Sequence, residues 1–339
     1  MIKKGIISLF ILAGIFLVAA GWWILIRPNV NTTKNPRVLL IPTGSTYNDL
    51  LIILKAEAIV NDPFSFDLWA RYRHYPLTVK PGRYLLSRNM NNREIVNLLK
   101  SGRQSPVTLV IYDVWLKEQL CGKIGRTLEM DSTAARQLLY SDSLNARWGT
   151  DTANTLSHII ADNYELYWNA SPATLIRKWE TAYRIFWNDE RRAKAALLQL
   201  NPEQVYTLAS IVERECMKDS ELKTVAGVYL NRLRIDMPLQ ADPTLKFATR
   251  DLDARRIVNW HKEFDSPWNT YKYKGLPPGP IGMPRKKTID AVLNAEKHDY
   301  LYFCANPDLS GYSIFSETYE KQMKVARMFQ RKMNQMNIR

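Results

Sequence analysis

The stretch Glu-Gln-Val-Tyr-Thr-Leu-Ala-Ser-Ile-Val-Glu-Arg-Glu-Cys occupies residues 203–216 and contains neither glycine nor proline. Asn201 and Pro202 precede it. Asparagine is a preferred N-cap residue, and proline favours the first position of a helix. The stretch therefore predicts a helix over residues 203–216 that Asn201 caps and Pro202 starts.

The two acids near the end of this helix are predicted to lie on different sides of it. Successive residues turn by about 100° around a helix axis, so an apolar stripe runs through Val205, Leu208, Ala209, Val212 and Cys216. Glu215 falls beside this stripe, next to Ile211, whereas Glu213 falls outside it. Apolar surroundings raise the pKa of a carboxyl group, because they penalise its charged form. Glu215 is therefore the candidate proton donor; a structural acid held by an arginine is the alternative.

Two segments downstream predict a binding groove. Residues 237–244 and 265–281 are rich in Pro, Asn, Gln, Thr and Tyr, and a second predicted helix over 221–235 precedes them. Prolines restrict the backbone of such loops, so hydroxyl and amide groups are held in place at a low cost in conformational entropy. Segments of this composition and length are uncommon in a hydrophobic core. We expect these two loops to line a polar and aromatic groove that suits a sugar chain.

The N-terminus predicts a membrane anchor. Residues 5–26 are uncharged and mostly apolar, with Lys3 and Lys4 before them and Arg27 after them. At 1.5 Å per residue this run is long enough to cross a hydrocarbon core of about 30 Å. A cleaved signal peptide is the alternative, but its apolar region spans only about 7 to 15 residues. By the positive-inside rule the tail of residues 1–4 is expected in the cytoplasm, and everything after Arg27 outside it.

Charge and composition restrict the partners and the chemistry. Lys and Arg exceed Asp and Glu by 47 to 33, a formal net charge of +14 that favours anionic partners. An extracytoplasmic location disfavours nucleic acid, which leaves wall polymer and phospholipid headgroups. Cys121, Cys216 and Cys304 are widely spaced and form no Cys-x-x-Cys pair. We therefore expect neither a metal site nor a cofactor, and the redox state of the three thiols stays open.

The rest of the chain predicts an α+β protein with two units beyond the anchor. Its 339 residues suffice for two or three domains at about 100 to 200 residues each. After a polar linker over 27–37, residues 38–105 read as strand, two helices, strand and helix, which is a small α/β module. Residues 106–339 open with a strand at 107–112 and continue as a larger, mostly helical unit with added strands and long loops.

Four motifs together resemble the endolytic murein transglycosylase family (YceG-like). They are Ala-Ser-Ile-Val-Glu-Arg-Glu at 209–215, Asn-Arg-Leu at 231–233, Leu-Gln-Ala-Asp-Pro-Thr at 239–244 and Gly-Leu-Pro-Pro-Gly-Pro-Ile at 275–281. With the anchor, their order and spacing cover essentially the whole chain. The resemblance implies that Glu215 is the catalytic acid, that 38–105 is a LysM-like domain and that 106–339 is the catalytic domain.

One element departs from the family pattern. The family usually carries Glu-Gly followed by Pro-Asp/Asn-Thr-Tyr upstream of the catalytic helix, and residues 161–164 here read Ala-Asp-Asn-Tyr. Asp162 and Tyr164 match the pattern, whereas the proline and threonine are missing. This leaves the geometry of that side of the groove open.

The resemblance implies a lytic transglycosylase of the inner membrane that cleaves the β-1,4 bond between N-acetylmuramic acid and N-acetylglucosamine in nascent strands. The C6 hydroxyl of the muramic acid replaces water as nucleophile, so a 1,6-anhydro product forms. Glu215 would first donate a proton to the leaving oxygen and then accept one from that hydroxyl. Peptidoglycan synthases are possible partners. The hypothesised substrate-binding residues are Gln240, Asp242, Thr244, Asn269, Tyr271, Asp162 and Tyr164.

Two other functions stay open at this point. A hydrolytic muramidase would need a second acid about 5 to 9.5 Å from Glu215, for which Asp242, Asp162 and Glu165 are candidates. A non-catalytic adaptor would instead hold glycan and dock a membrane synthase. Product analysis separates the first alternative from a lytic enzyme, and the substitution Glu215→Gln tests the second.

Overall fold

The structure is a computed structural model that describes residues 2–31, 35–254 and 256–335. It divides into two compact units. Unit 1 comprises Met1–Leu109, Thr127–Met130 and Glu165–Ser171, and unit 2 comprises Val110–Arg126, Asp131–Tyr164 and Pro172–Arg339. Residue 1 of the predicted tail, residues 32–34 of the predicted linker and the last four residues of the chain lie outside the described residues.

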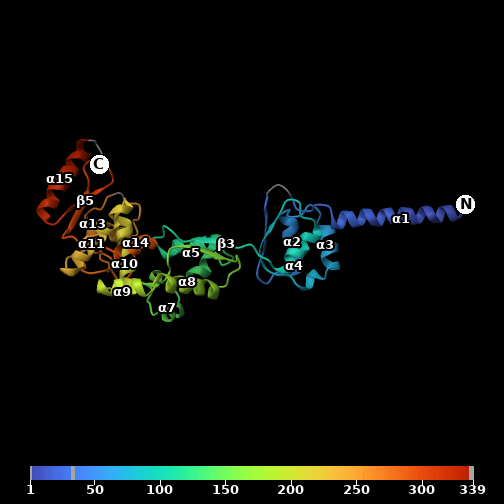
Figure 1. Cartoon of the computed structure of the whole chain (residues 1–339), viewed down its shortest axis with the longest axis horizontal. Helices are drawn as coiled ribbons and strands as arrows, with labels where there is room; N and C mark the ends of the chain where they lie inside the picture. The colour runs from blue at the N-terminus through green and yellow to red at the C-terminus, as the bar shows by residue number, and fades with distance from the viewer. Residues whose placement is uncertain (1, 32–34, 255, 336–339) are drawn as a thin grey trace. The chain divides into compact units, whose positions relative to one another are not determined.

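Unit 1 contains a two-stranded sheet and the helices that cover it. Its elements are α1 (Ile2–Leu25), β1 (Arg37–Ile41), α2 (Tyr47–Ala56), α3 (Pro63–Tyr72), a 3-10 turn (Tyr75–Leu77), β2 (Gly82–Leu86) and α4 (Asn92–Ser101). β1 and β2 pair antiparallel, from Arg37 opposite Leu86 to Ile41 opposite Gly82. Figure 1 shows α2, α3 and α4 gathered around this sheet. The order strand, two helices, strand and helix is the one predicted for residues 38–105.

The helix ends of unit 1 follow from local sequence. Thr46 and Asn91 each form a capping box, in which the N-cap side chain and the acid three residues later bond each other's backbone N–H groups. Asp62 caps α3, with Pro63 in the first turn. α4 ends at Gly102, whose φ of 72° is left-handed and costs glycine little. These boundaries confirm the three helices predicted here.

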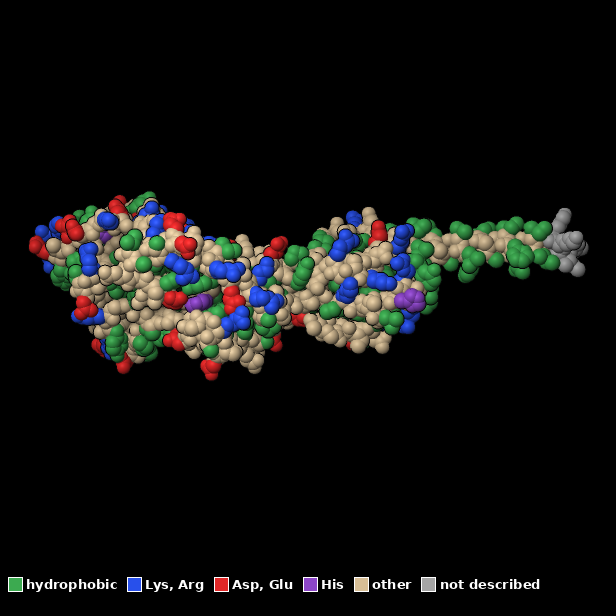
Figure 2. All heavy atoms as spheres, turned by 60° about the horizontal axis from the view of Figure 1, so that its bottom comes forward, with side chains coloured by type: hydrophobic (Ala, Val, Ile, Leu, Met, Phe, Trp, Pro, Cys, Tyr) green, Lys and Arg blue, Asp and Glu red, His purple; other side chains and the backbone are tan. Residues whose placement is uncertain are grey.

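The first helix, α1, is apolar. Its segment Ile6–Leu25 has a mean hydropathy of 2.3, and by length and composition it could cross a membrane. None of this span is buried within the protein. Figure 2 shows hydrophobic side chains along α1, with neither acidic nor basic ones between the grey N-terminus and the folded unit.

The chain does not leave α1 as a free polar linker. The Asn29 N–H donates to the carbonyl of Met90 at 2.9 Å, and the Asn31 N–H donates to that of Ile59 at 2.9 Å. Between them Val30 is fully buried in the core of unit 1. Over residues 28–31 the stretch predicted as a linker is therefore part of the folded unit.

Most helices belong to unit 2. The elements from residue 107 onward are β3 (Val107–Val110), α5 (Lys117–Thr127), α6 (Ser132–Leu139), α7 (Asp142–Trp148), a 3-10 turn (Thr155–His158), β4 (Asn163–Leu166), α8 (Pro172–Phe186), α9 (Asp189–Leu197), α10 (Pro202–Glu215), a 3-10 turn (Asp219–Glu221), α11 (Leu222–Arg234), α12 (Asp242–Thr249), α13 (Asn259–Glu263), α14 (Lys286–Leu293), β5 (Tyr302–Ala305), β6 (Ser313–Ser316) and α15 (Tyr319–Gln335). β3 pairs with β4, and β5 pairs with β6. With these small sheets and many helices, the predicted α+β class is confirmed.

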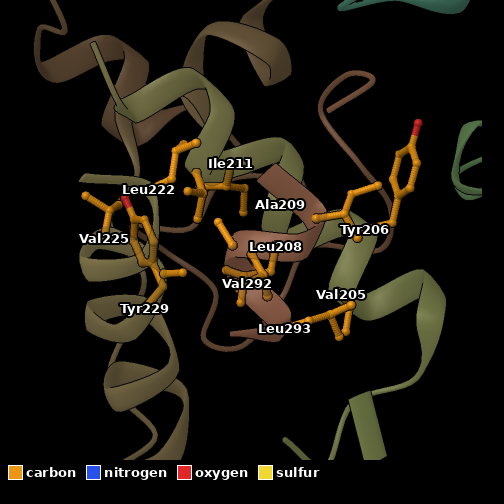
Figure 3. Packing of buried hydrophobic residues seen from close by; sticks show 14 of the residues in the cluster. Val205, Tyr206, Leu208, Ala209, Ile211, Leu222, Val225, Tyr229, Val292 and Leu293 are labelled. Atoms are coloured by element: carbon orange, nitrogen blue, oxygen red, sulfur yellow. The ribbon is translucent and has the colours of Figure 1, made fainter. Parts of the chain in front are cut away.

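The centre of unit 2 is α10. Every residue from Val205 to Val212 is buried, and the helix packs against α11 and α14. Figure 3 shows Leu208 and Ile211 among Tyr229 of α11 and Val292 of α14. Asn201 caps α10 through a capping box with Gln204, and Pro202 lies in the first turn, as predicted.

One prediction about the loops is wrong. Residues 237–244 were expected to form a loop throughout, but α12 begins at Asp242 and places Pro243 in its first turn. Pro243, Thr244 and Leu245 are buried. Burial of this apolar face stabilises a helix in the second half of the segment, and only residues 237–241 connect α11 to it.

Candidate active site

Glu215 is the last residue of α10, so the most deeply packed helix of unit 2 fixes its position. The next residue, Cys216, has an extended backbone and ends the helix. The Tyr229 hydroxyl, on α11, donates a hydrogen bond of 3.0 Å to Oε1 of Glu215. Tyr229 is 1% exposed, so the contact is made on the inner side of the helix pair. This is the apolar side on which the sequence placed Glu215.

The surroundings raise the pKa of Glu215 to about 7. Burial of the carboxyl group is the largest cause, and the negative charge of Asp242 adds to it. The Tyr229 hydrogen bond, the positive charge of Arg232 and the backbone of Asp242 oppose the rise, because they favour the carboxylate. Near neutral pH the group is thus poised to give up a proton and to take one back.

A second carboxylate, that of Asp242, belongs to the same cluster. Asp242 begins α12 and is exposed, and its Oδ1 accepts a hydrogen bond of 2.6 Å from the hydroxyl of Tyr271. Burial and this bond raise the pKa of Tyr271. Because Asp242 also acts on the pKa of Glu215, we call Glu215, Tyr229, Arg232, Asp242 and Tyr271 the acid cluster.

Arg232 of α11 supplies the positive charge of the acid cluster. Its side chain is buried, and burial lowers its pKa. The guanidinium donates to the carbonyl of Leu301 at 2.7 Å and to that of Leu239 at 2.6 Å. It also lies over the ring of Tyr302, 5.3 Å from the centroid. These bonds fix a cation where it stabilises the carboxylate form of Glu215.

The two predicted loops meet at the acid cluster. The Gln240 N–H donates to the carbonyl of Thr270 at 3.0 Å, and the Ala241 N–H donates to the Thr270 hydroxyl at 3.0 Å. The hydroxyls of Thr270 and Thr244 share a hydrogen bond of 2.8 Å. Thr270, which the sequence reasoning missed, therefore ties the start of α12 to the loop that carries Tyr271.

Two of the predicted substrate-binding residues in these two segments, Thr244 and Asn269, are buried. Thr244 also donates to the carbonyl of Ala241 at 2.7 Å. Asn269 donates from its amide nitrogen to the carbonyls of Lys262 and Phe264 at 2.9 and 2.7 Å, and its amide oxygen accepts from the Tyr271 N–H at 2.9 Å. Because these groups bond the protein itself, they suit the positioning of Tyr271 and Asp242 better than contact with a ligand.

Gln240 differs from these two residues. Its side chain is exposed, and its backbone has a φ of 49°, in the left-handed region that non-glycine residues seldom adopt. Gln240, Asp242 and Tyr271 are thus the predicted residues of these two segments whose side chains are not buried.

Asp162 and Tyr164 lie elsewhere in unit 2. Asp162 pairs with Lys286 at the start of α14. Tyr164 is buried, donates to the carbonyl of Ile160 at 2.6 Å and lies close enough to Tyr206 to raise its pKa, after the larger effect of burial. Tyr206 precedes Glu215 by nine residues, about 13 Å along α10. The two residues thus contact different parts of unit 2. Asp162 pairs with the residue next to Arg285, which binds Glu213 near the end of α10, whereas Tyr164 lies by Tyr206, nearer the start of that helix.

Glu213 has a different environment from Glu215. Its carboxylate accepts hydrogen bonds from the Arg285 side chain and the Thr288 hydroxyl, at the start of α14. Glu213 is thus the structural acid that an arginine holds. The prediction from helical periodicity, that the two glutamates lie on different sides of α10, is confirmed.

A pocket of about 460 Å³ adjoins the far end of α12. Phe247 and Arg250, from the end of that helix, line it with Trp115 and Trp268. The guanidinium of Arg214 lies 4.2 Å from the centre of the Trp115 ring. Asp242 and Phe247 are five residues apart on α12, a rise of about 7.5 Å along the helix axis, so one short helix contributes to both the acid cluster and the pocket.

The glycine-rich loop 275–281 closes one side of this pocket. The Trp268 indole donates to the carbonyl of Gly279 at 3.0 Å. A Cβ at position 279 would stand 2.2 Å from the carbonyl oxygen of Ala153. The close approach of two backbones explains why a residue without a side chain occupies this position.

Two members of the acid cluster were missed by the sequence reasoning. Tyr229 and Arg232 are three residues apart on α11 and share one face of it. The Asn-Arg-Leu motif at 231–233 contained a signal, since Arg232 belongs to it. Among the residues that the structure describes, no group of three or more His, Cys, Asp and Glu is placed to hold a metal ion.

Comparisons with known proteins agree on one family. A profile described as the YceG-like family matches residues 39–328. A Streptococcus pneumoniae (strain D39) protein named endolytic murein transglycosylase is 27% identical over 295 residues, which are 78% of this chain and 53% of that protein. A Bacillus subtilis (strain 168) protein of the same name is 25% identical over 338 residues, covering 93% of this chain and 89% of the relative. The chain thus spans about half the length of the pneumococcal relative.

A solved structure has the same fold. The crystal structure of a yceG-like protein from Listeria monocytogenes superposes with a TM-score of 0.59 at 27% sequence identity. The superposition covers 86% of this chain and 99% of the other.

Proposed function

Because the chain belongs to the YceG-like family, we propose that it is a membrane-anchored endolytic transglycosylase that cleaves peptidoglycan glycan strands with Glu215 as its catalytic acid. The observation that carries the proposal is the pKa of Glu215, which burial and Asp242 raise to about 7. The names of the relatives support the reaction class.

In the proposed reaction Glu215 acts twice on the bond between N-acetylmuramic acid and N-acetylglucosamine. The protonated carboxyl donates to the glycosidic oxygen as the C1–O bond breaks. The resulting carboxylate accepts the proton of the C6 hydroxyl as that oxygen bonds to C1 and closes the 1,6-anhydro ring. No water is consumed, and Glu215 ends the cycle protonated.

The other members of the acid cluster favour both halves of this cycle. Tyr229 and Arg232 stabilise the carboxylate that exists between the two proton transfers. Asp242 adds a negative charge beside the donor, which suits the positive charge that develops on the sugar ring. Gln240 and Tyr271 are proposed to contact the glycan, and Thr244 and Asn269 to position the loops.

The environment of the protein is part of the proposal. Residues 5–26 would cross the inner membrane with the tail 1–4 in the cytoplasm. The rest of the chain would lie on the other side of the membrane, where nascent strands and their synthases are found. Residues 38–105 would be a LysM-like domain, which the strand, helix, helix, strand order supports, and 106–339 the catalytic domain. Asp162 would contact glycan, and Tyr164, which is buried and bonds the carbonyl of Ile160, would position that element.

Digestion of isolated glycan strands by the purified full chain tests the proposal. We expect products that end in 1,6-anhydromuramic acid, and we expect Glu215→Gln to lower kcat/KM by at least about 100-fold. Glu213→Gln is the matched control, because it makes the same change two residues away on α10. Cleavage by the wild type with unchanged activity of Glu215→Gln would refute the assignment of the acid.

A hydrolytic muramidase is the second candidate, and the position of Asp242 favours it. Asp242 is a carboxylate close enough to raise the pKa of Glu215, as the second acid of a glycosidase would be. The same digestion separates the two reactions. Saturated reducing ends without the anhydro product would support hydrolysis and overturn the lytic reaction.

A further inference from the structure

The end of α1 is held rigidly by the rest of unit 1. Trp23 of α1 packs against Phe64 of α3, with ring centroids 6.3 Å apart. The amide of Asn92, on α4, donates to the carbonyl of Ile24 at 2.9 Å. Together with the burial of Val30, these contacts attach the end of α1 to α3, to α4 and to the core of unit 1. The direction of α1 therefore fixes which face of unit 1 lies next to it.

The helix that lies beside the end of α1 is α3. The two helices border an open apolar groove of about 260 Å³ that is lined by Gly21, Ile24 and Leu25 of α1 and by Leu68, Trp69 and Tyr72 of α3. Side chains of α3 are thus level with the last two turns of the apolar span, rather than beyond its end.

The length of the span sets the depth of α3. The apolar span Ile6–Leu25 has 20 residues, which at 1.5 Å each extend about 30 Å, the full thickness of a hydrocarbon core. Gly21 precedes Leu25 by four residues and so lies about 6 Å inside the boundary of that core. A helix packed beside Gly21 cannot stand clear of the bilayer.

The outer face of α3 has the composition that this depth requires. Phe64, Leu68 and Tyr72 follow one another at four-residue intervals and so share one side of the helix. They are 67%, 46% and 72% exposed, respectively. Such a stripe is costly in water and stable in the interfacial layer of a membrane, where the apolar face of an interfacial helix lies about 5 to 10 Å deep.

Basic and aromatic side chains border this stripe. The Arg73 guanidinium lies 5.6 Å from the centre of the Trp69 ring. Arg71 is exposed at the end of α3 and pairs with Asp67, one turn earlier, at 2.9 Å. Cations at this level attract anionic headgroups, and tyrosine and tryptophan are enriched there. Figure 2 shows hydrophobic and basic side chains next to each other on unit 1 where it joins α1.

We propose that α3 is a second membrane contact, in which Phe64, Leu68 and Tyr72 enter the lipid and the arginines at its end meet anionic headgroups. The inference depends on the membrane anchor in the proposed function. Unit 1 then contacts the bilayer through two helices: α1 crosses the membrane, and α3 lies in its surface. The remaining faces of unit 1, including the start of α2, point to the aqueous side.

Site-specific labels on the full chain test this contact. Cys121, Cys216 and Cys304 are replaced by alanine, and single cysteines are introduced by Leu68→Cys, Tyr72→Cys or, as the control, Asn48→Cys, which is exposed at the start of α2. Each protein carries an environment-sensitive fluorophore and is reconstituted into vesicles of phosphatidylethanolamine and phosphatidylglycerol. Iodide in the buffer then quenches only the labels that water reaches.

We expect the labels at positions 68 and 72 to lose their quenching by iodide and to shift their emission to the blue, while the label at 48 is quenched fully. Equal quenching at all three positions, in protein that stays with the vesicles after an alkaline wash, would overturn the contact of α3 and leave the anchor intact. Protein that washes off the vesicles would overturn the anchor and this inference with it. Neither result bears on the acid chemistry of Glu215, which the digestion tests separately.

Discussion

Removing the hydroxyl of Tyr229 should raise the pKa of Glu215. This hydroxyl donates to Oε1 of Glu215 at 3.0 Å and favours the carboxylate. A hydrogen bond to a charged group contributes about 1.5 to 3 kcal/mol, and about 1.4 kcal/mol corresponds to one pKa unit. Because the hydroxyl also bonds the neutral carboxyl, only part of this energy acts on the equilibrium. We expect Tyr229→Phe to raise the pKa by about one unit, from about 7.

The pH dependence of glycan cleavage measures this shift. The proposed reaction begins with protonated Glu215, so kcat/KM falls as pH rises through the pKa of Glu215 in the free enzyme. In Tyr229→Phe this alkaline limb should move up by about one pH unit, and the variant should retain more of its maximal activity at pH 8 than the wild type does. Release of soluble fragments from isolated strands, followed from roughly pH 5 to 9, gives the profile.

A tyrosine elsewhere in unit 2 is the matched control. The Tyr183 hydroxyl donates to Oε1 of Glu203 at 2.8 Å, so Tyr183→Phe also removes a bond from a phenol to a glutamate. It should leave the alkaline limb unchanged. An unshifted limb in Tyr229→Phe, or one that moves to lower pH, would refute the assignment of Glu215 as the titrating acid.

Three more expectations concern the acid cluster and its neighbour Glu213. Asp242→Asn removes a charge that raises the pKa of Glu215, so the alkaline limb should move to lower pH; a shift to higher pH would contradict this. The folded pKa of Glu215 is about 7 against an ordinary 4.5, so the wild type should lose about 3 kcal/mol of stability between these pH values. Glu215→Gln removes this loss and should be the more stable protein at pH 8 but not at pH 4 in denaturant unfolding; parallel pH curves would count against it. Glu213→Gln weakens the bonds from Arg285 and Thr288 and should cost about 1 to 3 kcal/mol of stability, while kcat/KM of the folded protein changes by less than about tenfold; a loss as large as that of Glu215→Gln would contradict the structural role.

The helices that the sequence predicted well have their signals within a few residues. Asn201 and Pro202 mark the start of α10, Asp62 and Pro63 that of α3, and Gly102 the end of α4. The start of α12 has a proline too, Pro243, but Ala241 at its N-cap makes no side-chain bond. It was read as part of a loop because the prolines and polar residues around it outweighed a short apolar face.

The candidate site was predicted in part. Helical periodicity alone separated Glu215 from Glu213, since both acids belong to one helix. The same reasoning could not find Tyr229, which is 14 residues farther along the chain and reaches Glu215 only because α10 and α11 pack together. Nor could it predict that the Asn269 amide donates to backbone carbonyls. A polar side chain in a loop has the same local sequence pattern whether it contacts a ligand or the protein.

By itself the sequence determined the helix starts, the apolar span of α1, the face on which Glu215 lies and the resemblance that led to the family. All of these features depend on capping residues, helical periodicity and local composition, which can be recognised from residues that are close together in the sequence. The tertiary structure decided the pKa of Glu215, the hydrogen-bond partners of the loop residues and the attachment of α1 to α3. Desolvation and charge at Glu215 come from α11 and α12, and the depth of α3 comes from α1, so both arise from contacts between segments that are distant in the sequence.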